Sequence, residues 1–360
     1  MYHRSQNASP RLSSGFTIVE LMISITLGLV IVSSITQVLV RNKSLSKTEV
    51  SLSRIQESGR FVINTLAEDL RNVGYHGCTD PSKMKLTVMA RTGIDADFGA
   101  TSLRGFEVGT DGDFEPAIVS GDALANIQGA GALKARQGSD VVQLKYADRT
   151  GAKLTAPTDV INASLSVDSN TAGLATGDYA LVADCQSAHL FEITNVSTTS
   201  GITTLQHATA DNNPHQITPG YNADSDLLAF RDITYFVADT GRKKNGTTSV
   251  YALYRKRHTS ATPEELVEGV EFLQVLYGEQ VGSNIRFVPA GTSGLNMQAV
   301  TAIKIGILIQ DFDVSVPEND TVTYSLLNAS IPPTGTVSHN SGRTLRKAFS
   351  ATVQLRNTRM

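Results

Sequence analysis

Glu20 is the residue of this sequence with the clearest potential for chemistry, because it is the only charge within the apolar run from Phe16 to Val40. That run is long enough to cross a bilayer as a helix, which takes about 20 residues. A carboxylate in the hydrocarbon layer costs about 2.5–3.5 kcal/mol on insertion scales and usually has a function there. The alternative is that Glu20, about one turn from the start of the run, extends to the lipid headgroups.

Other residue types that could support catalysis or metal binding do not form a recognisable site. The chain has no Gly-x-Ser-x-Gly elbow and no His-Glu-x-x-His motif, and its seven histidines are scattered. Its two cysteines, Cys78 and Cys185, lack the spacing of a metal site. We therefore expect no catalytic residue, no cofactor and no metal, and we do not expect an enzyme.

The residues around the apolar run differ from those of an ordinary secretory signal. Arg4 and Arg11 precede the run, as they would in such a signal, but the small residue Gly15 comes before the apolar core instead of after it. The stretch GFTIVEL at residues 15–21 resembles the N-terminus of type IV prepilins and type II secretion pseudopilins.

The resemblance implies a processing pathway and a role for the single acid. Residues 1–15 would be a leader, and the prepilin peptidase would cut between Gly15 and Phe16 and methylate Phe16. Glu20 would then serve subunit assembly by pairing with the Phe16 amino group of a neighbouring subunit.

The segment after the apolar run predicts that the same helix continues. Apolar residues recur on one helical face, at Leu45, Leu52, Ile55, Val62, Leu66, Leu70 and Val73. We expect one helix from Phe16 to about Val73, within an N-terminal segment 16–77 whose half 16–40 spans the membrane. The stretch RIQESGRFVINTLAEDLRNVGYHGC at residues 54–78 resembles large minor pilins of the PilW type.

The remainder, residues 78–360, predicts an extracytoplasmic head rich in strands. Residues 79–135 indicate loops with short elements. Strands are predicted at 141–146, 179–183, 190–194, 203–206, 233–237, 250–255, 265–278, 300–309, 322–327 and 349–355. The expected fold class is α+β, with a long N-terminal helix packed on a mainly antiparallel β-sheet head, as in pilins. The stretches 177–185, 265–278 and 343–357 also resemble PilW-type chains.

Topology and cysteine chemistry depend on the orientation of the span. Arg4 and Arg11 favour a cytoplasmic leader, whereas the basic residues 41, 43 and 47 oppose it by counting alone. The resemblance implies a cytoplasmic leader and a head outside the cytoplasm, where Cys78 and Cys185 could form a disulfide. Such a loop of roughly 100 residues would gain at most about 4.7 kcal/mol. The alternative is two buried free thiols.

Charge gives little indication of a polyanionic partner. The formal net charge of −3 becomes −5 once the leader, with Arg4 and Arg11 and no acid, is removed. Basic residues at 242–244 and 255–257 could contact phosphate, so contact with nucleic acid is one interpretation. The alternative is that these charges are solvated and keep a strand edge from pairing with another chain.

The resemblance implies a minor pilin of the type IV pilus. It would act in a tip complex that primes pilus assembly and supports adhesion, twitching motility and DNA uptake. The partners would be the prepilin peptidase, other minor pilins, the major pilin, the inner membrane and a tip adhesin. The protein would sit in the inner membrane with its head in the periplasm, and after assembly at the pilus tip. Alternatives are a J-type minor pseudopilin of type II secretion, and a membrane-tethered hydrolase or adhesin with a ligand-binding head.

Overall fold

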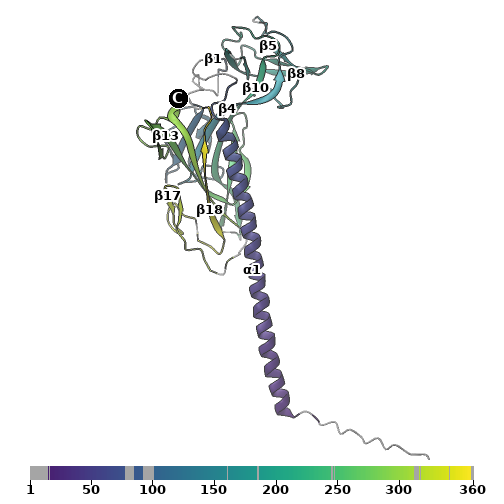
Figure 1. The fold of residues 1–360 in the computed structure, drawn as a ribbon, viewed down its shortest axis with the longest axis vertical. Coiled ribbons are helices and arrows are strands. Elements are labelled where there is room, and N and C mark those ends of the chain that lie inside the picture. Colours follow the sequence, from purple (N-terminus) through teal and green to yellow (C-terminus); the bar gives the residue numbers. More distant parts are fainter. Residues whose placement is uncertain are drawn as a thin grey trace, which may run out of the picture. The chain divides into compact units, whose positions relative to one another are not determined.

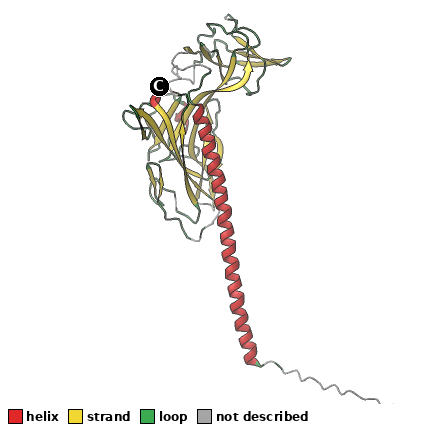
Figure 2. Ribbon diagram, viewed as in Figure 1, coloured by secondary structure: helices red, strands yellow, loops and turns green. Residues whose placement is uncertain are grey.

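The computed structural model has one long helix and a head built from strands, which confirms the predicted fold class (Figures 1 and 2). The structure describes residues 15, 17–77, 85–91, 101–159, 161–184, 186–244, 246, 248–311, 316, 318–339 and 341–357. Helix α1 spans Ile18–Asn72. The chain forms two compact units, Met1–Val50 and Ser51–Met360, and α1 contributes to both.

The largest sheet of the second unit has nine strands. Its main order is β1-β7-β6-β10-β4-β2-β3, with β11 paired to β10 and β12 paired to β11. The bounds are β1 Lys85–Val88, β2 Leu103–Val108, β3 Phe114–Glu115, β4 Asp140–Lys153, β6 Tyr179–Ala183, β7 Ser187–Glu192, β10 Asp226–Lys244, β11 Thr248–Arg257 and β12 Glu264–Glu268. Every pair is antiparallel except β1 with β7.

Three smaller sheets complete the described part of the head. A four-stranded sheet has the order β14-β13-β15-β18, a three-stranded one β5-β9-β8, and β16 pairs with β17. The bounds are β5 Ser164–Val167, β8 Asn195–Thr199, β9 Ile202–Gln206, β13 Val270–Val281, β14 Asn284–Val288, β15 Val300–Gln310, β16 Tyr324–Leu326, β17 Ala329–Ile331 and β18 Arg346–Gln354; the short 3-10 helices are η1 Ala123–Ile127 and η2 Met297–Ala299.

The helix packs on the head through a regular apolar row. Ser51, Ile55, Gly59, Val62, Leu66, Ala67 and Leu70 are buried. The apolar side chains among them join one core with residues of the nine-stranded sheet, such as Leu144, and of the four-stranded sheet, such as Ile305. Each large side chain buried in this way contributes about 1.5–3 kcal/mol. The helix therefore packs against both sheets and links them through this core.

The predicted apolar face was wrong at its start. Leu52 is 36% exposed, and Ser51 is buried instead. Residues recur on one helical face at steps of three and four, and Ile55 lies four residues after Ser51, so that position continues the row. Leu45 belongs to the first unit and is also exposed.

The sequence 265–278, predicted as one strand, forms two. β12 pairs with β11 in the nine-stranded sheet, whereas β13 pairs with β15 in the four-stranded sheet. The break falls at Gly269, whose φ of 93° is readily adopted only by glycine. One apolar run thus supplies strands to two sheets.

The two sheets are also joined by side chains at the start of β4. The Ser139 hydroxyl accepts from Leu273 N at 3.0 Å, and the Asp140 carboxylate accepts from Val275 N at 2.6 Å. Arg136 donates to the carbonyl of Glu271 at 2.8 Å. These bonds satisfy backbone groups of β13 on the side away from β15.

Candidate functional site

The first turn of α1 is closed by a reciprocal pair of hydrogen bonds. Thr17 Oγ1 accepts from Glu20 N at 3.2 Å, and Glu20 Oε2 accepts from Thr17 N at 3.3 Å. This is a capping box, in which a Thr and a Glu three residues apart satisfy two backbone donors at a helix start. The Thr-x-x-Glu pattern was readable in the sequence and was missed there. Glu20 thus has a partner within its own chain.

The predicted processing residues are only partly within the described chain. Gly15 is exposed, and a Cβ placed on it would meet no atom within 4 Å. Phe16 lies outside the described residues, so its pairing with Glu20 stays a prediction.

The apolar half of α1 leaves its side chains open. From Ile18 to Val40 the large apolar side chains are 53–78% exposed. This helix is long and apolar enough to cross a membrane. Four hydroxyls along it, those of Ser24, Thr26, Ser34 and Thr36, each donate to a backbone carbonyl within the helix at 2.8 Å. Apolar exposure on this scale needs lipid or another protein.

The second half of α1 is anchored to the head by one carboxylate. Tyr146 of β4 donates to Asp69 Oδ1 at 2.7 Å, and Tyr235 of β10 donates to Oδ2 at 2.5 Å. Burial raises the pKa of both phenols, and the Asp69 charge raises it further, so both remain donors. The Asp-Leu-Arg motif at residues 69–71 therefore holds the helix against two neighbouring strands.

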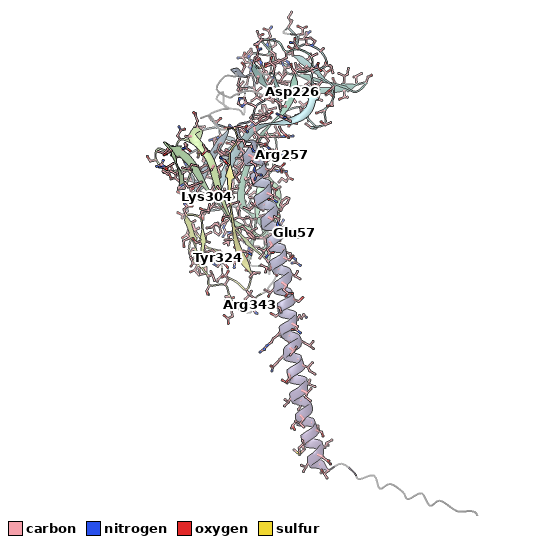
Figure 3. The ribbon with its side chains drawn as sticks, viewed as in Figure 1. Glu57, Asp226, Arg257, Lys304, Tyr324 and Arg343 are labelled. Atoms are coloured by element: carbon pink, nitrogen blue, oxygen red, sulfur yellow. The ribbon has the colours of Figure 1, made fainter. Side chains whose placement is uncertain are left out.

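A glycine sets the distance between α1 and the last strand. A Cβ on Gly59 would lie 2.6 Å from the ring of Phe349 in β18. That is closer than side-chain atoms approach one another, so the helix reaches β18 because residue 59 has no side chain. Gly59 therefore has a packing role in the helix. Glu57, on the exposed side of the same turn, is labelled in Figure 3.

Two family models match the chain. Residues 234–357 match the model described as type IV pilus-assembly protein W, PilW, and residues 10–36 match the prokaryotic N-terminal methylation motif. Over these two segments the chain is similar to PilW and to prepilin-like proteins. Among curated proteins, no sequence matches it significantly. Together the two matches support the role of a type IV pilus minor pilin, with processing by a prepilin peptidase, membrane anchoring and contacts to other pilus components.

The PilW match also covers residues of the head that hold the helix. Tyr235 and Phe349, which contact Asp69 and Gly59, both lie within residues 234–357. The methylation motif covers Gly15, Thr17 and Glu20. The matched segments therefore contain Glu20, the candidate assembly residue, and part of the head surface on which α1 packs.

Cys78 and Cys185 lie outside the described residues, so their disulfide stays a prediction. Their neighbours in the sequence approach one another. A Cβ on Gly77 would lie 3.3 Å from the Cβ of Ala183, the last residue of β6.

Two of the basic residues considered for phosphate contact, Arg242 and Arg255, already bind acids. Arg242 donates to Glu265 at 2.6 and 2.9 Å and to Glu268 at 2.7 Å, and Arg255 donates to Glu264 at 2.9 Å. All three acids belong to β12. These ion pairs disfavour nucleic-acid contact at the hairpin and favour its reading as a solvated edge.

The most deeply buried ion pair of the described head has a structural role. Arg346 of β18 donates to Glu271 of β13 at 2.7 Å and to Asp320 at 3.1 Å. Its side chain is 1% exposed, and it also donates to Gln310 and to the His339 carbonyl. These contacts tie the segment before β18 to the four-stranded sheet. Within the described chain, no group of His, Cys, Asp and Glu is arranged to hold a metal.

Proposed function

We propose that this PilW-type chain is a minor pilin of a tip complex that primes polymerisation of the major pilin. Before assembly, the first half of α1 lies in the inner membrane and the head in the periplasm. After assembly, the chain sits at the pilus tip, where it supports adhesion and twitching. The observation that carries the proposal is the exposed apolar helix bearing Glu20 at its start, on a chain whose head matches PilW.

Glu20 is the assembly residue in this proposal. In the isolated chain its carboxylate accepts from Thr17 N. On assembly it gains the Phe16 amino group of a neighbouring subunit, a stronger partner because opposite charges attract more in a low dielectric than in water. The same pairing offsets the free-energy cost of placing the neighbour's charged amine in the apolar layer.

The test compares Glu20→Ala with Thr17→Val. Both variants break the capping box, at a cost of about 1 kcal/mol to the helix start. Only Glu20→Ala removes the carboxylate. We expect normal processing in both, and a fall of about tenfold or more in co-purification with other minor pilins for Glu20→Ala alone, the factor that corresponds to 1.4 kcal/mol.

Two outcomes would overturn the assembly role. One is a Glu20→Ala chain that is processed, co-purifies and supports surface piliation as the unmodified chain does. The other is an equal loss in Thr17→Val, which would assign the effect to the helix cap. Gly15→Val is the processing control, because a side chain before the cleavage point should leave full-length precursor in the membrane.

The J-type minor pseudopilin of type II secretion remains the second candidate, since its N-terminus would look the same. The PilW match in the head favours the pilus. Co-purification decides between them, because the neighbours recovered would be pilins in one case and pseudopilins in the other.

A further inference from the structure

A polar cavity of about 270 Å³ lies on the face of the nine-stranded sheet opposite α1. Side chains alternate between the two faces of a strand. In β4, Val142 and Leu144 belong to the core that contains the helix, so Gln143 and Lys145 project to the other face. Both line the cavity and both are buried.

The cavity interrupts two apolar clusters on that face. Along β4, Val141 belongs to one cluster and Ala147 to the other, with the two polar side chains between them. Along β10, Phe236 and Phe230 belong to the same two clusters, and the buried Asp232 lies between them. A belt of buried polar groups across central strands is costly unless it is satisfied by partners or ligand.

The polar groups form a connected chain of hydrogen bonds from four segments. Arg104 of β2 donates to Asp122 at 2.6 Å and to Gln143 Oε1 at 3.1 Å. Gln143 Nε2 donates to Asp232 Oδ1 at 2.8 Å. His258, just after β11, places Nδ1 3.8 Å from the other Asp232 oxygen. The network fixes the orientation of each side chain before any ligand arrives.

The charges that line the cavity balance. Arg104 and Lys145 bring two formal positive charges, and Asp122 and Asp232 bring two formal negative charges. Burial lowers the pKa of His258 and raises the pKa of Asp232, so burial disfavours the charged form of both groups. An anionic ligand would meet two carboxylates and a cationic ligand two cations. Donors and acceptors therefore alternate around the cavity without a net charge, an arrangement that suits hydroxyl groups, which donate and accept at once.

The surroundings of the cavity supply apolar contact as well. Val119, at the rim, is 70% exposed. A second hollow of about 20 Å³ shares Asp232 and His258 with the cavity and is lined by Tyr179, whose ring centroid lies 5.6 Å from that of His258. Arg257, labelled in Figure 3, marks this end of β11. Ligand pockets usually run from about 300 to 1,000 Å³, so this one suits a ligand of about one sugar ring.

We propose that the cavity between β2, β4, β10 and the loop 119–123 binds a neutral sugar. Arg104, Gln143, Asp232 and His258 contact its hydroxyls, and Val119 packs on a C–H face of the ring. The ligand class follows from the charge balance, because the hydroxyl groups of a neutral sugar can use both the donors and the acceptors. The site lies in the head and does not depend on the assembly role of Glu20.

The experiment is saturation-transfer NMR on the full-length chain in a zwitterionic detergent that carries no sugar headgroup. The probes are glucose, galactose and N-acetylglucosamine as neutral sugars, and glucuronate as an anion. Each is present at about 10 mM, tenfold above a Kd of about 1 mM. We expect transfer to at least one neutral sugar and weaker transfer to glucuronate.

Ser120→Trp tests whether that binding occurs in the cavity. Ser120 is an exposed lining residue outside the hydrogen-bonded chain, so an indole there fills the space without breaking the network. Transfer should fall about tenfold, equivalent to about 1.4 kcal/mol. The matched control is Ser197→Trp on the exposed strand β8, which should bind as the unmodified chain does.

Asp122→Asn tests the charge balance. Its Oδ1 can still accept from Leu124 N, so the loop keeps its cap, while the cavity becomes cationic. Glucuronate binding should rise about tenfold relative to the unmodified chain. The proposal is overturned by any of three results: no transfer to any neutral sugar, preferential transfer to glucuronate in the unmodified chain, or equal transfer in Ser120→Trp. An unchanged glucuronate signal in Asp122→Asn would overturn the charge argument and with it the ligand class.

Discussion

The bond pair from Tyr146 and Tyr235 to Asp69 predicts how firmly α1 is held to the head. A hydrogen bond to a charged group contributes about 1.5–3 kcal/mol. Asp69 is only half-buried, so water can replace part of each bond, and we expect the lower end of that range. Tyr235→Phe or Tyr146→Phe should each cost about 1.5–2 kcal/mol. Asp69→Ala should cost about 3 kcal/mol or more, because it leaves two buried phenols unpaired.

Urea unfolding followed by far-UV circular dichroism measures these changes, since the chain has no tryptophan to report by fluorescence. The matched control is Tyr277→Phe. Tyr277 is as buried as Tyr235, but its hydroxyl has no hydrogen-bond partner among the described residues. Tyr277→Phe should therefore be neutral or stabilising. Surface substitutions usually change the free energy of unfolding by no more than about 0.5 kcal/mol. If Tyr235→Phe and Tyr146→Phe both stay within that range, the two hydrogen bonds to Asp69 do not stabilise the packing of α1 on the head.

Three further changes test other parts of the molecule. His207 is buried, and burial lowers its pKa from 6.5 to about 4. Between these two pH values the unfolded state therefore binds more protons than the folded state. The contribution of His207 to the free energy of unfolding should be constant above pH 7 and should fall by about 3 kcal/mol as the pH drops from 6.5 to 4. His207→Phe should remove this dependence of the urea midpoint, and an identical pH profile would contradict it. Gly59→Ala should destabilise the head by about 1–3 kcal/mol through overpacking against the Phe349 ring, despite a gain of about 1 kcal/mol in helix propensity. Adding Phe349→Leu to that variant should restore most of the lost stability in a thermal melt. A Gly59→Ala chain as stable as the unmodified one would refute the contact. Cys78 and Cys185 should be oxidised in the exported protein, so thiol labelling of denatured, unreduced chain should find neither free; two labels per chain would refute the disulfide.

The long helix and its docking face could be predicted because their signal is local. Apolar residues at Ile55, Val62, Leu66 and Leu70 repeat at helical spacing, and the structure buries all four. The error at Leu52 arose because the apolar residues near the start of the face do not define which side of the helix turns toward the sheets. Only the contact with the sheets selects Ser51.

The hairpin of β10 and β11 was also predictable, since both strands are rich in β-branched and aromatic residues and flank a glycine-containing turn. The pairing of Val237 with Leu253 confirms it. Short strands such as β2 and β5 were not predicted. Their propensities are weak, and they become strands through partners distant in the sequence.

The polar cavity could not be predicted at all. Arg104, Gln143, Asp232 and His258 are separated by up to 154 residues in the chain. Strand register brings them together, since Arg104 faces Gln143 and Asp232 faces Lys145 across neighbouring strands. No local pattern in the sequence carries that register.

The side chains at the start of β4 have a consequence for how copies of this chain can meet. An exposed strand edge offers a row of free N–H and C=O groups on which another chain can add a strand, which is a common route to aggregation. On the stretch of β13 that precedes its pairing with β14, Ser139 and Asp140 occupy the N–H groups of Leu273 and Val275, and Arg136 occupies the Glu271 carbonyl. That edge cannot template a foreign strand. Because this stretch of β13 is also buried, its backbone is closed to strand addition by another copy of the chain.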